Sequence, residues 1–131
     1  MLDSIVLDAS VIAAIFFDED VTDEVREVVA KYRPITVDWV YAEVGNIAWK
    51  RIAKFKKDPD VTKASMAKCL GYLESCSVFR GVELCESALE LAVEDRITFY
   101  DALYVAASKT TGAPLYTLDK KLGRIENVLV L

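Results

Sequence analysis

Four acidic residues of this sequence each stand alone inside an apolar stretch, where a predicted strand gives way to a helix or a turn. They are Asp8, Glu43, Asp101 and Asp119. Acidic side chains are rarely buried unless they are paired or bind a metal ion. Carboxylate oxygens suit Mg²⁺ and Mn²⁺, and two such ions about 4 Å apart can clamp the attacking and leaving oxygens of a phosphodiester. The pattern therefore indicates a Mg²⁺ or Mn²⁺ site with the chemistry for phosphodiester cleavage.

Each of these acids also has an ordinary structural explanation. Asp8 could cap the helix after the first strand, although Ser10 is the better candidate for that cap. Glu43 could pair with a lysine on its own helix, Asp101 could stabilise a helix start, and Asp119 could simply belong to a turn. We prefer a shared role as metal ligands because it explains all these positions together, with Asp119 acting directly or through water.

Polar and aromatic neighbours of the acids are candidates for supporting roles. Ser10, Asn46 and Thr117 could orient carboxylates or metal-bound water. Capping or a plain backbone hydrogen bond explains each of them equally well. Tyr100 and Tyr104 lie one predicted helical turn apart, and we expect them to serve core or dimer packing rather than base stacking.

A stripe of basic residues continues the predicted helix face that carries Glu43. Such a stripe could guide an RNA backbone toward a metal site. A solvated helix face or a contact with a protein partner explains it equally well. A second basic group follows Asp119 and carries the same two interpretations. The residues concerned are Lys50, Arg51, Lys54, Lys56 and Lys57 in the first group, and Lys120, Lys121 and Arg124 in the second.

Composition limits the chemistry that is possible. The chain has 131 residues, of which 53% are hydrophobic, so we expect one domain over residues 1–131. It contains no histidine, which excludes Ser-His-Asp and Cys-His catalysis. The net charge of −5 argues against binding nucleic acid through bulk charge, although a local basic track beside a metal is compatible with it. No signal-peptide or membrane-spanning pattern is present, so we expect a cytoplasmic protein.

Strands and helices alternate along the chain, which predicts an α/β fold with a doubly wound, mostly parallel sheet and helices on both faces. Ligands of such sheets bind beyond the carboxyl ends of the strands, so the four acids are expected to meet at one edge. The predicted strands are Ser4–Leu7, Pro34–Val37, Ser77–Phe79, Leu115–Leu118 and Asn127–Leu131. The predicted helices run from Ser10 as cap to Phe17, from Thr22 or Asp23 to Tyr32, over Trp39–Phe55 with Asp38 as cap, from the Asp58–Asp60 turn to Ser75, over Leu84–Glu94, from Thr98 as cap to Gly112, and as one turn over Lys120–Arg124. The acidic stretch Asp18–Asp20 is expected to break the first helix.

These motifs, in this order and spacing, resemble those of PIN domains, particularly the ribonuclease toxins of VapBC toxin–antitoxin systems. The resemblance covers essentially the whole chain and rests on four segments: Leu7–Ser10, Glu43–Asn46, Thr98–Tyr104 and Thr117–Asp119. It implies metal-dependent endonucleolytic cleavage of single-stranded RNA, leaving 5′-phosphate and 3′-hydroxyl ends. It also implies a homodimer or higher homo-oligomer and a small VapB-like antitoxin partner.

Other functions are compatible with parts of the pattern. A non-catalytic PIN-like interaction module would keep the acidic pocket only for binding, but all four acidic positions are present. A PIN-like nuclease could also process RNA without being a toxin. Receiver domains and aspartate-nucleophile phosphatases carry paired acids after their first strand, and Asp8-Ala9-Ser10 has no such pair.

Overall fold

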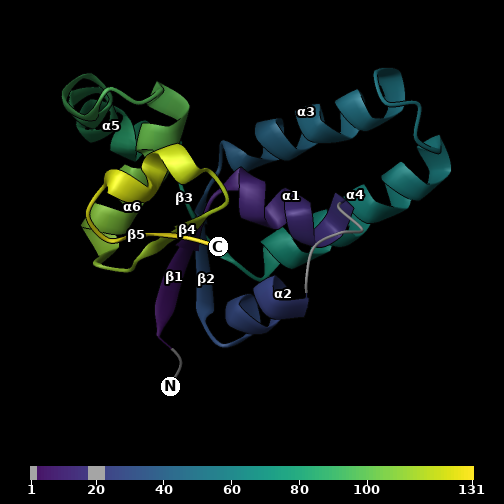
Figure 1. Ribbon diagram of the computed structural model, residues 1–131, viewed down its shortest axis with the longest axis horizontal. Coiled ribbons are helices and arrows are strands. Elements are labelled where there is room, and N and C mark those ends of the chain that lie inside the picture. The colour runs from purple at the N-terminus through teal and green to yellow at the C-terminus, as the bar shows by residue number, and fades with distance from the viewer. Residues whose placement is uncertain (1–2, 18–22) are drawn as a thin grey trace.

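The computed structural model describes residues 3–17 and 23–131 and contains a five-stranded sheet with helices on both faces (Figure 1). Every strand pairing is parallel, and the strand order is β3-β2-β1-β4-β5. The predicted α/β architecture is therefore confirmed. The strands are β1 (Ser4–Leu7), β2 (Arg33–Val37), β3 (Ser77–Phe79), β4 (Leu115–Thr117) and β5 (Val128–Val130).

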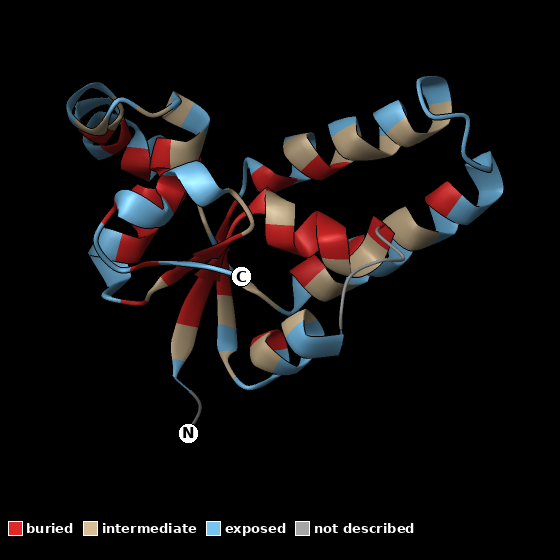
Figure 2. Ribbon diagram, viewed as in Figure 1, coloured by how far each residue is buried: buried red, intermediate tan, exposed pale blue. Residues whose placement is uncertain are grey.

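The central strand β1 is buried on both faces, because helices cover the sheet from either side (Figure 2). Ile5 and Leu7 pack into one core with α1, α3 and α4, whereas Val6 packs into the other core with α5 and α6. This alternation follows from the two-residue period of a strand. The helices are α1 (Ala9–Phe17), α2 (Asp23–Ala30), α3 (Val40–Ala53), α4 (Pro59–Glu74), α5 (Gly81–Asp95) and α6 (Phe99–Thr111), followed by the 3₁₀ turn η1 (Lys120–Arg124).

Several predicted helix boundaries are confirmed. Thr98 caps α6 by accepting a hydrogen bond of 3.1 Å from the Asp101 amide, and Gly112 ends that helix in the left-handed conformation with φ 76°. Asp58 caps α4, with Pro59 at its first position. The break expected over Asp18–Asp20 lies outside the described residues. None of the described helices is long and apolar enough to cross a bilayer.

The predicted cap of α3 is wrong, because Asp38 serves a different helix. Trp39 occupies the cap position of α3 and makes no side-chain cap. The Asp38 carboxylate instead accepts a hydrogen bond of 2.9 Å from the amide of Gly81, the first residue of α5. This contact lets α5 begin at Gly81 rather than at the predicted Leu84. The end of α3 also differs, at Ala53 rather than Phe55.

The predicted cap of α1 is also wrong. The helix begins at Ala9, so Ser10 lies inside its first turn. Asp8 occupies the preceding position, and its carboxylate accepts a hydrogen bond of 3.2 Å from the Val11 amide. Asp8 therefore provides the cap that was expected from Ser10, and the Ser10 hydroxyl remains available for other contacts.

Candidate active site

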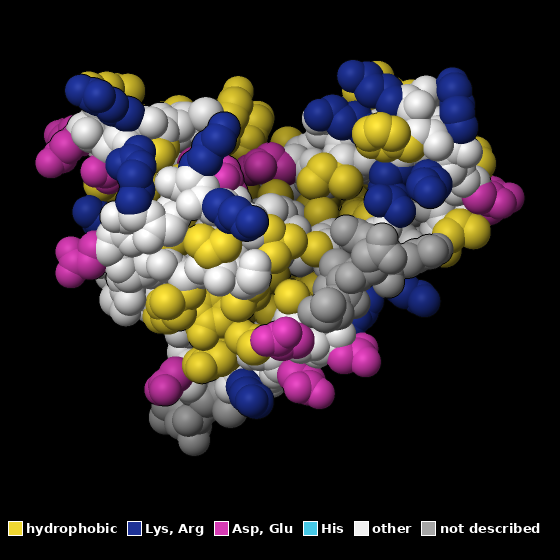
Figure 3. All heavy atoms as spheres, in the orientation of Figure 1, with side chains coloured by type: hydrophobic (Ala, Val, Ile, Leu, Met, Phe, Trp, Pro, Cys, Tyr) yellow, Lys and Arg dark blue, Asp and Glu magenta, His cyan; other side chains and the backbone are white. Residues whose placement is uncertain are grey.

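The four predicted acids lie at the carboxyl edge of the sheet. Asp8 directly follows β1, and Asp119 follows β4 after one intervening residue. Glu43 lies in the first turn of α3, and Asp101 lies in the first turn of α6. Figure 3 shows acidic side chains in the hollow between the α3 side and the α5–α6 side of the molecule, with Lys and Arg side chains on both rims. The edge predicted from the alternation of strands and helices, beyond the carboxyl ends of the strands, is the one that carries these residues.

Asp8 is held by hydroxyl groups from both ends of the chain. Its side chain is buried, with only 6% exposed. The hydroxyls of Ser10 and Thr117 donate hydrogen bonds of 2.5 Å to its two carboxylate oxygens. Both hydroxyls in turn accept backbone hydrogen bonds, from Leu118 at 3.1 Å and from Asp119 at 3.0 Å. This network fixes the Asp8 carboxylate against the segment that follows β4.

Glu43 is held by a tyrosine from another helix. The Tyr104 hydroxyl of α6 donates a hydrogen bond of 2.8 Å to Glu43 Oε1 of α3. Tyr104 is 1% exposed and stands in an otherwise apolar stretch of its helix. The bond therefore links the two helices that carry Glu43 and Asp101, and it limits the positions open to the Glu43 carboxylate.

Asp101 and Asp119 share a cavity of about 460 Å³ with several basic side chains. Asp119 Oδ1 accepts a hydrogen bond of 2.9 Å from the Lys121 amide and caps η1, so the ordinary turn explanation applies to it in part. The remaining lining residues are Arg96, Ile97, Thr98, Lys121, Leu122 and Arg124. This side of the site thus combines acidic and basic groups.

Charge repulsion between the acids shows that they form one electrostatic unit. Burial raises the pKa of Asp8, Glu43 and Asp101 above the ordinary carboxyl values. Repulsion adds to this effect: Asp101 raises the pKa of Asp8, and both of these acids raise the pKa of Glu43. Asp119 likewise raises the pKa of Asp101. A bound cation would relieve this repulsion and restore the charged carboxylates.

The acids do not form a closed ligand cage. Within residues 3–17 and 23–131, no three acidic or cysteine side chains are gathered closely enough to hold one ion between them. A hydrated Mg²⁺ needs no such cage, because it usually keeps several waters and binds through one or two carboxylates and substrate phosphates. The hard oxygen donors and their mutual repulsion fit such an ion, and the absence of a cage does not conflict with it.

The predicted supporting and basic residues differ in how close they lie to the acids. Ser10 and Thr117 contact Asp8 directly, whereas Asn46 is exposed and no hydrogen bond joins its amide to a carboxylate among the described residues. Arg51 lines a small cavity that also contains Ser10. Lys121 and Arg124 line the cavity that holds Asp101 and Asp119. Lys50, Lys54 and Lys120 line neither cavity: Lys50 and Lys120 are exposed, and Lys54 lies beyond the end of α3 with its Nζ 5.6 Å from the Trp49 ring centroid.

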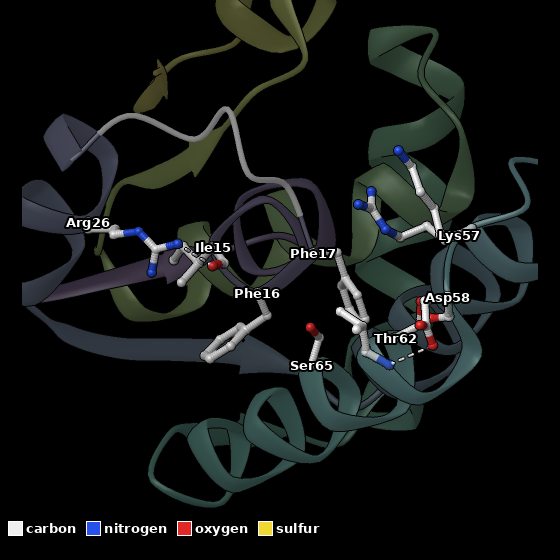
Figure 4. A pocket seen from close by; sticks show the side chains of 10 residues that line it. Ile15, Phe16, Phe17, Arg26, Lys57, Asp58, Thr62 and Ser65 are labelled. Atoms are coloured by element: carbon white, nitrogen blue, oxygen red, sulfur yellow. Dashed lines mark hydrogen bonds between the residues drawn. The ribbon is translucent and has the colours of Figure 1, made fainter.

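A further cavity lies away from the carboxylates, between the ends of α1 and α4 (Figure 4). Phe17 and Asp58 line it, and Arg26 reaches it while donating a hydrogen bond of 2.8 Å to the Ile15 carbonyl. None of the four acids contributes to its wall. The cavity is therefore separate from the candidate active site.

Sequence reasoning missed two residues of the site. Tyr104 was expected to pack in the core, and it does, but its hydroxyl also binds Glu43. A tyrosine in a buried apolar helix is itself a signal, because buried tyrosines usually find a hydrogen-bond partner. Arg96 lines the cavity with Asp101 because it ends α5 in the left-handed conformation, with φ 56°. No local pattern distinguishes that arginine from other exposed ones.

Comparison with known proteins gives consistent results. The sequence profile of the family described as PIN domain matches residues 5–128. Ribonuclease VapC3 from Pyrobaculum aerophilum is 29% identical over 119 residues, which cover 90% of this chain and 91% of that protein.

Solved structures resemble the whole fold. The crystal structure of PAE2754 from Pyrobaculum aerophilum has a TM-score of 0.74 and 24% identity, covering 97% of this chain and 82% of that chain. A toxin–antitoxin complex from Klebsiella pneumoniae contains a chain with a TM-score of 0.73 and 14% identity, covering 96% of both chains. At these identities the structural similarity establishes the fold.

Proposed function

Because this chain belongs to the PIN domain family, we propose that it is a divalent-metal-dependent endoribonuclease that hydrolyses RNA phosphodiester bonds. The observation that carries the proposal is the set of mutually repelling carboxylates at the carboxyl edge of the sheet, of which Asp8 is buried and Glu43 and Asp101 are half-buried. Such a set is unfavourable without a cation and becomes useful with one. The similarity to Ribonuclease VapC3 supports RNA as the substrate.

Mg²⁺ or Mn²⁺ is the proposed metal, and Asp8, Glu43, Asp101 and Asp119 are its proposed ligands. One or two of these carboxylates would bind an ion directly, and the others would bind it through coordinated water. When bound, such an ion lowers the pKa of a coordinated water and stabilises charge on the phosphate. The protein's own residues position this chemistry. Ser10 and Thr117 fix the position of the Asp8 carboxylate at the end of β1, and they lower its pKa by donating hydrogen bonds to it.

Tyr104 of α6 likewise positions the Glu43 carboxylate, and its hydrogen bond lowers the pKa of that carboxyl. Basic side chains on both sides of the acids are suited to contact RNA phosphates. Arg51 lies on the side of Ser10, and Arg96 and Lys121 lie on the side of Asp101. Lys50, Lys54 and Lys120 would contact RNA only further from the carboxylates.

The biological role that fits this activity is that of the toxin in a toxin–antitoxin pair. The toxin–antitoxin complex from Klebsiella pneumoniae, which contains a chain with this fold, supports an antitoxin as partner, and we propose a small VapB-like protein in that role. The proposal includes a homodimer or higher homo-oligomer. It also places the protein in the cytoplasm, where its RNA substrates are found.

The experiment that tests the activity is cleavage of a mixed RNA pool by purified protein with Mg²⁺ or Mn²⁺. We expect cleavage that stops when EDTA removes the metal, and that is lost in Asp101→Asn. Asp60→Asn is the matched control, because Asp60 also lies in the first turn of a helix but is remote from the site. A folded Asp101→Asn protein with normal activity would overturn the ligand assignment. A folded wild-type protein that binds metal but cleaves no RNA in the pool would favour a binding module instead.

A further inference from the structure

An exposed aromatic pair stands beside the candidate active site. The rings of Trp39 and Tyr100 are stacked, with centroids 5.3 Å apart and planes inclined by only 4°. Trp39 is the cap residue of α3, four positions before Glu43, and Tyr100 directly precedes Asp101 on α6. The pair therefore bridges the starts of the two helices that carry these acids.

The pair is unusual because both of its rings face solvent. Trp39 is 39% exposed and Tyr100 is 53% exposed, so core packing, which was expected for Tyr100 as the alternative to dimer packing, is excluded. In the other two aromatic pairs among the described residues, the rings pack into the protein: Tyr32 packs against the buried Tyr116, and Phe16 packs against the half-buried Tyr72. An exposed stacked pair leaves outer ring faces available for another planar group.

We propose that Trp39 and Tyr100 form a stacking platform for a base of single-stranded RNA next to the cleaved bond. The inference rests on the proposed ribonuclease activity and assigns the pair as substrate-binding residues. Every base has a π-face, so aromatic stacking holds single strands with little sequence preference. The carboxylates would act on the phosphate. They would not contact the neighbouring base, so a separate surface is needed to bind it.

The arrangement of the pair favours tight stacking. Each ring packs on the other, and the hydrogen bond from Tyr104 to Glu43 joins the two helices that carry the rings, so the platform is ordered before RNA binds. A preorganised surface loses less side-chain entropy on binding. Basic groups on the same side of the site, Arg96 and Lys121, lie in the cavity that holds Asp101 and would contact the adjoining phosphates. Base, backbone and reacting phosphate would thus each meet a suitable surface.

Steady-state cleavage of a short single-stranded RNA tests the platform. We expect Trp39→Ala and Tyr100→Ala to raise KM about 5- to 100-fold, with kcat changed by less than about threefold, because stacking is lost while the carboxylates remain. Trp39→Phe and Tyr100→Phe keep a flat ring and should restore most of the affinity. Trp49→Ala is the matched control, since Trp49 is as exposed as Tyr100, at 53%, but lies ten residues after Trp39, nearly three turns further along α3.

Fluorescence gives a second measurement. The chain has two tryptophans, so in Trp49→Phe the emission comes from Trp39 alone. Adding a phosphorothioate RNA of about ten nucleotides, which is cleaved slowly, should quench that emission through stacking.

Three outcomes would overturn the inference. If the wild-type protein cleaves RNA and the Ala variants at both positions keep the KM of Trp49→Ala, the platform does not exist. If those variants change the mass of the assembly in light scattering but not the affinity for RNA, the pair is a protein interface. If the wild-type protein neither binds nor cleaves RNA, the proposed function fails and the platform fails with it.

Discussion

The Tyr104 hydroxyl donates a hydrogen bond of 2.8 Å to Glu43, a residue 61 positions away in the sequence. This bond joins α6 to α3 near the N-terminal ends of both helices, which carry Asp101 and Glu43. It gives the buried tyrosine its polar partner and gives the carboxylate a fixed orientation. Tyr104→Phe removes only the hydroxyl and keeps the buried ring, so it tests the orientation of Glu43 without removing the packing of Tyr104.

Tyr104→Phe is expected to lower RNA cleavage about 10- to 100-fold, which is the usual effect of losing a group that orients a metal ligand. The pKa of Glu43 should rise further, because Tyr104 lowers it. The pH at which activity is half-maximal should therefore move upward, as measured by cleavage rates across a pH series. Tyr41→Phe, at an exposed position of α3, is the control. Equal pH profiles for the two variants would refute the role of the bond.

Asp101→Asn is expected to stabilise the metal-free protein at neutral pH. Burial raises the pKa of Asp101 in the folded state, so the folded protein holds this proton more tightly than the unfolded chain does. Stability from this group is present below the ordinary Asp pKa of 3.8 and is lost as pH rises through the raised pKa. The asparagine cannot ionise and avoids that loss. Urea unfolding in EDTA should show a gap between variant and wild type that widens from pH 4 to pH 7.

Metal should reverse this difference. Adding Mg²⁺ or Mn²⁺ is expected to stabilise the wild-type protein, by about 2.7 kcal/mol at 100 times the dissociation constant, and to stabilise Asp101→Asn much less. An equal gain in both proteins would place the ion elsewhere.

Thr117→Val keeps the shape of the side chain but removes the hydroxyl that donates to Asp8. A buried carboxylate deprived of a donor should cost about 1–3 kcal/mol of unfolding free energy. The pKa of Asp8 should rise, since this bond lowers it, and metal-dependent cleavage should require higher pH. Thr36→Val is the matched control, because its buried hydroxyl donates to the Leu7 carbonyl at 2.9 Å. That variant should lose stability without a shift in the pH profile.

Asp38→Ala is expected to destabilise the fold by about 1 kcal/mol, because the start of α5 loses its cap. Gly81→Ala should also destabilise, since a Cβ there would lie 2.9 Å from Asp38 Oδ1. In the double variant the clash disappears, so its loss should be smaller than the sum of the single losses. Gly71→Ala in α4, where a Cβ meets no neighbour, should be neutral or stabilising. Strict additivity in urea unfolding would contradict this account.

The sequence is sufficient to predict the sheet and the edge that carries the acids, because those features depend on local periodicity. Apolar runs define β1 and β4, and Thr98 and Gly112 mark the two ends of α6. Parallel topology then places residues after the strands at one edge. The fold and the family are confirmed, whereas the ligand roles of Asp8, Glu43, Asp101 and Asp119 remain predictions.

The features that sequence reasoning missed depend on partners far along the chain. Asp38 has the residue type of a local cap, but its partner Gly81 lies 43 positions away and only the folded sheet brings them together. The bond from Tyr104 to Glu43 and the stacking of Trp39 on Tyr100 have the same origin. Helical spacing indicates which face a residue occupies, and it contains no information about which other helix that face meets.

The link between Asp8 and Thr117 also sets a time for the appearance of activity during biosynthesis. The two residues are 109 positions apart, so Thr117, which β4 brings to Asp8, is translated 109 residues after Asp8. At typical elongation rates this interval lasts roughly 5 to 20 seconds. During this interval the Asp8 carboxylate lacks the hydrogen bond from Thr117, so the candidate active site is completed only after β4 has been translated.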